Sequence, residues 1–382
     1  MFKYFSLLFD SNQGSTVLLY TMLFVFGSLF AFLSQSKGKF RLSWFLFSFF
    51  LLWFFFAFND VGIDTEHYKH YFRIYTSFAD CDGQNGAVEL LYQYLNVILH
   101  YITKSPDIAV AIVRTLQLAI FYYAIYIMKD RIKLGFAIMA YVAFFYFDSF
   151  NLLRSSLSGS LCLLSFAKLY GKKYVSSLIT AGLAFGFHFS ALTYIVVLLI
   201  YMLSNSKALS KKKYLLAIFA IIVIFVIVNY GNSFIVGQIV KNDLGEGRYD
   251  NYIYGSSSVG FFILFKYLPV FAILYLIGKK VTAEDSRWWF MNFMCGIAGF
   301  AIAILAYQIG IMARAAIMFS QAYVFFIPYY VIVRRQEPYI KTATLGRAFN
   351  TIMILFYIIM FVFSLSSLYE PSGLNDFKFY WQ

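Results

Sequence analysis

The chain has 382 residues, of which 61% are hydrophobic and only 13% are charged. Soluble globular domains carry roughly 25% charged residues, so the composition excludes a soluble protein and predicts one integral membrane domain over residues 1–382. The net charge of +13 does not indicate a nucleic-acid partner, because the basic residues lie in short segments between apolar runs.

Apolar runs that can cross a bilayer core of ~30 Å as a helix recur along the chain. The predicted spans are 16–34, 42–58, 108–128, 134–150, 155–170, 214–230, 259–278, 288–308, 315–333 and 348–368. One further apolar run, 174–204, fits either a single tilted helix or a hairpin of two short helices.

The distribution of charge distinguishes these two alternatives. Two crossings at 174–204 place most of the lysines and arginines, including Lys211–Lys213, on one side, as expected for cytoplasmic loops. A single crossing would put Lys211–Lys213 outside. We therefore predict an all-α polytopic membrane protein with about 12 transmembrane helices, with both termini outside and two longer external loops, about 59–107 and 231–258.

The first external loop contains an amphipathic pattern. Apolar residues recur at three- and four-residue spacing, and polar residues occupy the opposite face. The apolar residues are Val88, Leu91, Leu95, Ile98 and Ile102, and the polar ones are Glu89, Gln93, Asn96 and His100. The pattern predicts a helix that lies at the outer interface. A helix that only floors the loop fits the pattern equally well.

Cationic side chains are expected at one level of the membrane, near its outer face. They are Arg114, Arg154, Lys266, Arg314 and His188, the last at the reversal of the 174–204 hairpin. A charge within the hydrocarbon is costly and therefore marks a candidate site, although arginine and lysine near span ends also snorkel to headgroups. Because arginine binds phosphate in a bidentate manner, this group predicts a site for a lipid-linked phosphate or pyrophosphate. Arg248, in the second external loop, is assigned to the same site.

The first external loop also supplies carboxylates and aromatic side chains. Asp64 and Glu89 are candidate bases, although Asp64 also suits the N-cap of a helix that begins at Thr65. Tyr68 is counted with the substrate-binding residues, because tyrosine rings near these acids suit stacking on sugars.

The order of these motifs resembles a known family. It runs from Gly62-Ile-Asp64-x-x-x-Tyr68-x-x-x-Phe72 to Glu89, Arg154 and Phe187-His188-x-Ser190-Ala-Leu. Over residues 1–200 this order is similar to that of the EpsG-like branch of the Wzy-type O-antigen, capsule and exopolysaccharide polymerases. The chain departs from the family pattern at Ser155, where a glutamine often follows the arginine, and at Leu90, where a glycine often follows the glutamate.

The resemblance implies a membrane glycosyltransferase that polymerises undecaprenyl-pyrophosphate-linked oligosaccharide repeat units. It would act at the outer face of a bacterial plasma (inner) membrane, in O-antigen or capsule biosynthesis. Arg154, Arg114 and Arg314 would stabilise the leaving pyrophosphate, and His188, Asp64 or Glu89 would deprotonate the acceptor hydroxyl, with His188 preferred. No metal and no cofactor are predicted. The expected partners are the lipid-linked donor and acceptor glycans and the bilayer, and a chain-length regulator protein is a candidate partner.

Other functions stay open at this point. A transporter or flippase of lipid-linked oligosaccharide would be expected to show an inverted repeat and polar residues in both membrane halves, and the sequence shows neither. An O-antigen ligase or another outer-face transferase shares the arginines and the histidine, so the sequence does not separate it from a polymerase. A purely structural membrane subunit is the remaining alternative.

Overall fold

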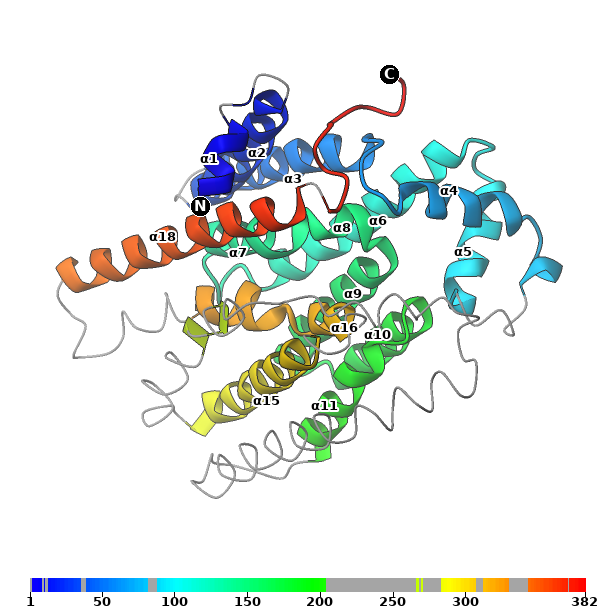
Figure 1. Ribbon diagram of the computed structural model, residues 1–382. Coiled ribbons are helices and arrows are strands. Elements are labelled where there is room, and N and C mark those ends of the chain that lie inside the picture. The colour runs from blue at the N-terminus through cyan, green and yellow to red at the C-terminus, as the bar shows by residue number, and fades with distance from the viewer. Residues whose placement is uncertain are drawn as a thin grey trace.

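A computed structural model of the chain shows how the predicted elements pack (Figure 1). It describes residues 2–8, 10, 13–35, 39–81, 88–203, 266–267, 269–270, 283–306, 312–329, 343–369 and 371–382. The predicted span 214–230, most of 259–278, and the second external loop 231–258 with Arg248 lie outside the described residues. Within the described ranges every regular element is a helix, so the all-α prediction is confirmed there.

The long helices coincide closely with the predicted spans. They are α2 (Gly14–Leu33), α3 (Arg41–Ala57), α6 (Pro106–Ile127), α9 (Leu153–Tyr170), α15 (Ala283–Leu305) and α18 (Ala343–Leu368), and the short α1 (Phe2–Leu8) precedes them. Three stretches, Gly14–Leu33, Pro106–Ile127 and Arg347–Leu368, are long and apolar enough to cross a membrane, and several shorter apolar helices accompany them. The total of about 12 transmembrane helices stays a prediction.

Two predicted spans contain π-helical turns. The span at 134–150 consists of α7 (Leu134–Tyr141), a π-helix (Val142–Tyr146) and α8 (Asp148–Asn151). The span at 315–333 includes α16 (Met312–Ala316), a 3₁₀ turn (Ile317–Phe319) and a second π-helix (Ala322–Phe326). Both π-helices are buried throughout. Such bulges interrupt the regular hydrogen-bond ladder and are frequent near functional sites.

The apolar run at 174–204 is a hairpin, as the charge distribution predicted. Helix α10 (Tyr174–Phe187) and helix α11 (Ala191–Leu203) are separated by a reversal at 188–190, where the backbone of His188 is extended with φ −159° and ψ 124°. The run therefore forms two helices rather than one, and that each of them crosses the membrane stays a prediction. His188 and the start of α9 are brought to the same end of the helical bundle, because α10 packs along α9.

Helix α9 lies between α6 and α10 and carries small residues on its packing faces. Ser158 donates a hydrogen bond to the backbone oxygen of Ala184 at 2.8 Å, and Ser160 accepts one from Gln117 at 3.0 Å. A Cβ at Gly159 would lie 2.8 Å from a methyl group of Ile317. Small residues of this kind allow close approach of helices in membranes, where interhelical contact depends on van der Waals packing.

The C-terminal segment closes the end of the bundle at which His188 lies. Residues 371–382 follow α18 and run along the loop after α3, where Asn59 and Phe379 form an isolated antiparallel bridge (Figure 1). The backbone N–H of Asp60 donates to the oxygen of Lys378 at 2.9 Å. Because it holds these segments and the 188–190 reversal, we call this the loop end of the bundle.

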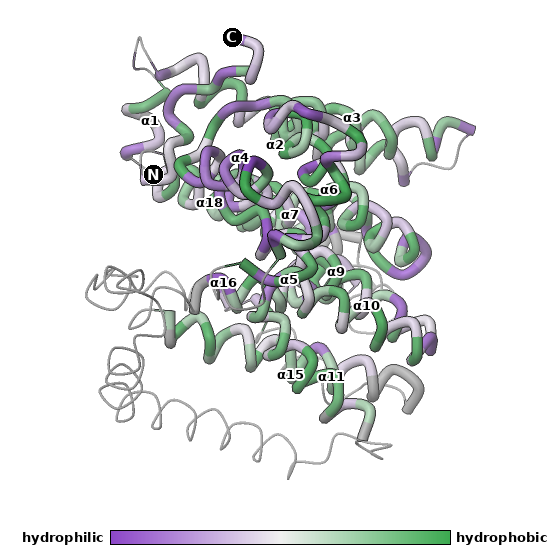
Figure 2. Tube along the Cα trace, turned by 90° about the vertical axis from the view of Figure 1, so that its right-hand side faces the viewer, coloured by the Kyte–Doolittle hydropathy of each residue, from purple (hydrophilic) through white to green (hydrophobic). Residues whose placement is uncertain are grey.

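The helix predicted in the first external loop is α5 (Leu90–His100), and it lies beside α4 (Thr65–Ile74). Its polar residues point into the protein: Gln93 and Asn96 are buried together with Tyr92, Val97 and Leu99, whereas Leu90 and Ile98 are exposed. Figure 2 shows that α4 is far more hydrophilic than the surrounding long helices. An outward apolar face is expected where lipid, rather than water, surrounds the helix.

Candidate active site at the loop end

The site is built around a break between two helices. Helix α8 ends at Asn151, Leu152 leaves helical geometry with φ −93° and ψ 48°, and α9 begins at Leu153. The hydroxyl of Tyr68 fills this break, because it accepts a hydrogen bond from the N–H of Leu153 at 3.0 Å and donates one to the oxygen of Asn151 at 2.5 Å. The break places Arg154 in the first turn of α9, with its backbone anchored by the loop helix α4.

Arg154 extends from this turn towards the start of α5. Its guanidinium donates to Oε2 of Glu89 at 2.5 Å, and the ring centroids of Tyr71 and Tyr92 lie 5.6 Å and 5.8 Å from it. The side chains of Arg154 and Glu89 are 13% and 21% exposed. A partly buried ion pair flanked by aromatic rings is more strongly attractive than one in water. The pair therefore links α9 to the loop before α5.

Glu89 also contacts the reversal between α10 and α11. Its Oε1 accepts a hydrogen bond from the N–H of Phe189 at 3.1 Å and lies 4.0 Å from Nδ1 of His188. The same Nδ1 accepts a hydrogen bond from the N–H of Ser190 at 3.2 Å. One carboxylate thus pairs with an arginine and lies beside a histidine ring, and we call Glu89, Arg154 and His188 the loop-end triad.

The imidazole of His188 is neutral at ordinary pH. Burial lowers its pKa to about 4, the charge of Glu89 raises it in part, and the charges of Arg154 and Arg314 lower it further. Arg314 lies in α16 and is half-buried. The charge of Arg314 lowers the pKa of both His188 and Tyr68, which lie at the loop end, and its role as a phosphate ligand stays a prediction.

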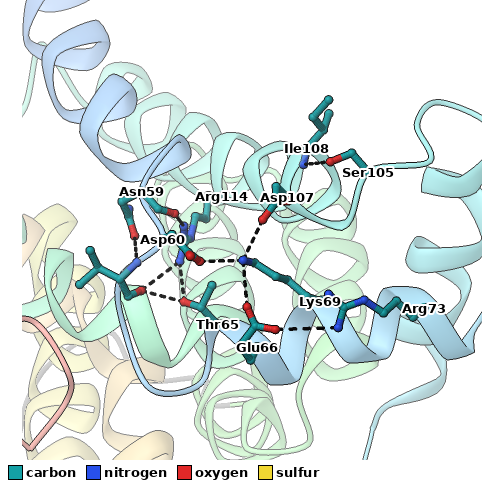
Figure 3. Close-up of polar contacts among 11 residues, drawn as sticks. Asn59, Asp60, Thr65, Glu66, Lys69, Arg73, Ser105, Asp107, Ile108 and Arg114 are labelled. Carbon is teal, nitrogen blue, oxygen red and sulfur yellow. Dashed lines mark hydrogen bonds and ion pairs between the residues drawn. The ribbon is translucent and has the colours of Figure 1, made fainter. Parts of the chain in front are cut away.

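Arg114 is placed differently from the other predicted phosphate ligands. It is 1% exposed, and its guanidinium donates to the oxygen of Asn59 at 2.6 Å and to Oγ1 of Thr65 at 3.0 Å (Figure 3). A ring of Phe56 lies 5.8 Å from its charge. Arg114 therefore holds the backbone that leads into α4, and it serves the site through this loop.

Asp64 and Tyr68 also contribute through backbone contacts. Asp64 directly precedes α4, as predicted for an N-cap, but its side chain makes no capping hydrogen bond, and its N–H donates to Oδ1 of Asn151 at 3.2 Å. Burial raises the pKa of Tyr68 to about 12, the charge of Arg154 lowers it, and that of Asp64 raises it. The Tyr68 hydroxyl is thus protonated and engaged with the helix break rather than open for a sugar ring.

An ion cluster that the sequence did not predict fastens α4 to α6. The buried ammonium of Lys69 lies 2.7 Å from Asp60, 2.8 Å from Asp107 and 3.0 Å from Glu66 (Figure 3). Burial lowers the pKa of Lys69, but the hydrogen bonds that its ammonium donates to Asp107, Asp60 and Glu66 raise it above its ordinary value. The signal in the sequence was Lys69 three residues after Glu66, a spacing at which helical side chains pair.

The role of Asn151 was also not predicted from the sequence. Its Nδ2 donates to the oxygen of Ser372 at 2.9 Å, so it ties the helix break to the C-terminal segment. Gly62 packs against it with φ +102°, and a Cβ there would lie 2.7 Å from Oδ1 of Asn151. A polar residue at the end of an apolar span was the available signal, but its partners are too distant in sequence to be identified from the pattern.

Lys266 lies among aromatic rings. Its ammonium lies 5.1 Å, 5.6 Å and 5.5 Å from the ring centroids of Phe144, Phe145 and Tyr323. These rings belong to the two π-helices, so Lys266 is a cation among aromatic rings within the bundle. Its nearest aromatic contacts therefore differ from those of Arg154, whose flanking rings come from α4 and α5.

Comparison with known proteins identifies the family of the chain. A family model described as the EpsG family matches residues 42–379. The chain belongs to the EpsG family. No curated protein and no solved structure matches it. The family suggests an exopolysaccharide-related polymerase, and the apolar helices agree with a membrane protein.

The EpsG motifs noted in the sequence converge in the structure. Tyr68 binds the backbone next to Arg154, Arg154 pairs with Glu89, and Glu89 reaches the His188 reversal. Gly62 supports the same helix break through Asn151. Among the described residues of this EpsG-family protein, no group of three or more histidine, cysteine or acidic side chains is arranged to hold a metal ion.

Proposed function

We propose that this EpsG-family protein polymerises undecaprenyl-pyrophosphate-linked oligosaccharide repeat units at the outer face of a bacterial plasma membrane. The observation that carries the proposal is the loop-end triad, in which one carboxylate pairs with an arginine and lies 4.0 Å from a neutral histidine at one end of a helical bundle. A glycosyl transfer with a pyrophosphate leaving group needs both a fixed cation and a proton acceptor.

The proposed reaction assigns these two needs to separate residues. A hydroxyl of one lipid-linked unit attacks the anomeric carbon of the growing chain, and the bond from that carbon to the pyrophosphate oxygen breaks. The electron pair leaves with the lipid pyrophosphate, whose negative charge Arg154 and Arg314 stabilise. The hydroxyl proton passes to the imidazole of His188, which is neutral and therefore able to accept it.

The remaining predicted site residues support these groups. Arg114 holds the backbone that leads into α4, and Tyr68 on α4 holds the backbone just before Arg154, so we propose that they position the site rather than touch substrate. Asp64, at the start of α4, is the alternative base, and Arg248 stays a proposed contact to the pyrophosphate. The chemistry proposed here uses no metal.

Two substitutions test the assignment. Arg154→Lys keeps the charge but loses the planar fork that grips two phosphate oxygens, so we expect loss of long polymer at normal protein level. His188→Gln preserves size while removing the base, and we expect a rate loss of ~10²–10⁴-fold. Arg73→Lys is the matched control, because Arg73 lies on α4 but is 54% exposed, and should leave the polymer unchanged.

The products distinguish the proposed function from its rivals. In cells that carry the inactive variants, a polymerase defect leaves single repeat units that are still transferred and displayed outside. Loss of a ligase would instead leave long chains on the lipid carrier, and loss of a flippase would trap single units inside. Full-length polymer from Arg154→Lys would remove this residue from the pyrophosphate site.

A further inference from the structure

The hydrogen bonds of His188 determine which ring nitrogen carries its proton. A backbone N–H is only a donor, so the contact from Ser190 at 3.2 Å requires a lone pair on Nδ1. The neutral ring then carries its hydrogen on Nε2. In this arrangement Nε2 is a hydrogen-bond donor, and it cannot take a proton from an acceptor hydroxyl until the ring adopts the other tautomer.

The other tautomer needs an acceptor for a hydrogen on Nδ1, and Glu89 is placed to provide one. Its Oε1 lies 4.0 Å from Nδ1, about 1 Å too far for a hydrogen bond. Two contacts hold the carboxylate at this distance: Oε1 accepts from the N–H of Phe189, and Oε2 pairs with Arg154. The Phe189 contact keeps the carboxylate next to the ring, so the ion pair with Arg154 must change for Glu89 to reach Nδ1. The N–H of Ser190 must also release Nδ1, because a protonated nitrogen cannot accept its hydrogen bond.

We propose that Glu89 is a positioning residue that couples the binding of a phosphate group at Arg154 to the tautomer of His188. When a phosphate group takes the N–H groups of Arg154, the carboxylate of Glu89 turns to Nδ1 of His188 and accepts a hydrogen bond from it. The ring releases the hydrogen of Nε2 to water and takes one from water at Nδ1, so its charge is unchanged. Nε2 is then a free base.

Competition for Arg154 drives this exchange. A phosphate group and a carboxylate both bind the same guanidinium, and their like charges repel each other when both are near it. The charge of Arg314 adds to the attraction for the incoming phosphate, and those of Arg154 and Arg314 keep His188 from gaining a second proton. The coupling rests on the proposed function in one respect, because it takes the pyrophosphate of the donor as the phosphate group.

The consequence concerns the timing of the chemistry. Without a donor at Arg154, His188 presents a hydrogen to any hydroxyl that enters the site and cannot deprotonate it. With the donor bound, the same residue becomes a base. The triad thereby restricts activation of the acceptor hydroxyl to the complex that contains a leaving group.

Nitrogen NMR of the full chain can observe the tautomer directly. The chain has 4 histidines, so labelling histidine with ¹⁵N gives few ring signals, and His188→Gln assigns those of His188. The full-length protein in lipid nanodiscs is measured at pH ~7 with and without inorganic pyrophosphate, and binding is followed separately by ³¹P NMR. We expect the hydrogen on Nε2 without pyrophosphate and a Nδ1-protonated population with it.

Matched variants separate coupling from a general effect. In Glu89→Gln, the tautomer should no longer respond although pyrophosphate binds. Glu66→Gln, at an exposed glutamate on α4, should respond as the wild type does. Pyrophosphate binding with an unchanged His188 tautomer would overturn the coupling and leave the proposed function standing. Absence of pyrophosphate binding would overturn both.

Discussion

The acid limit of activity should lie far below the ordinary pKa of histidine. Burial is the main reason that the pKa of His188 falls from 6.5 to about 4. The charge of Glu89 raises this pKa, and the charges of Arg154 and Arg314 offset part of that increase. If His188 is the base, kcat/KM should stay high until the pH approaches 4, because this quantity reports the free enzyme.

The expected size of the effect follows from these two values. At pH ~5.5 an ordinary histidine is about one-tenth neutral, whereas a group with a pKa of about 4 is almost wholly neutral, a difference of about tenfold in active enzyme. The same shift affects folding. The pKa of His188 is depressed in the folded state. Its contribution to the free energy of unfolding is therefore fully present above pH ~6.5 and is lost as the pH falls towards 4, by up to about 3 kcal/mol.

The assay is the initial rate of consumption of lipid-linked repeat units by membranes between about pH 3.5 and 8, with protein level and thermal stability measured at each pH. Glu89→Gln removes the contribution that raises the His188 pKa, so the acid limb of any remaining activity should move further down. An acid limb near pH 6.5 in stable wild-type protein would refute the assignment of a buried, neutral His188 as the base.

Three further outcomes are expected. Tyr68→Phe removes both hydrogen bonds at the helix break and should lower the free energy of unfolding by ~1–3 kcal/mol, and the activity with it. Unchanged melting temperature and polymer length would show that the break does not depend on the hydroxyl. Gly62→Ala should cost ~1–3 kcal/mol, because φ is +102° and the new methyl group would press on Asn151, and wild-type melting would contradict this. In a chain whose native cysteines are replaced, an impermeant thiol reagent should label Phe189→Cys but not Lys212→Cys, and strong labelling of Lys212→Cys would overturn the twelve-span topology.

The orientation of helix α5 shows what a local sequence pattern cannot predict. The sequence predicted a helix within 88–102, and α5 (Leu90–His100) is that helix, although its buried side combines polar Gln93 and Asn96 with apolar Val97 and Leu99. Only packing showed that Gln93 and Asn96 lie inside and Ile98 outside. The period of a helix identifies its faces, but the direction of the polar face depends on whether the surroundings are water, lipid or another helix.

The role of each cationic side chain likewise depends on the groups that form hydrogen bonds or ion pairs with it. Arg114 and Arg154 are both arginines near the same end of the bundle, and the sequence treated them alike. Arg114 is enclosed by the oxygen of Asn59 and the hydroxyl of Thr65, which lie about 50 residues earlier in the chain. A pattern of residue types cannot show whether distant backbone groups will occupy a guanidinium, because loop conformation determines that.

The amino-acid sequence by itself determined the helices, because apolar runs of membrane length and the segregation of basic residues need no tertiary contact to be recognised. It also determined the order of the motifs and, through charge alone, the hairpin at 174–204. The tertiary structure decided how these motifs meet. Glu89, Arg154 and His188 come together only because α5, α9 and the α10–α11 reversal reach one end of the bundle, where a single carboxylate pairs with Arg154 and accepts a hydrogen bond from the reversal next to His188.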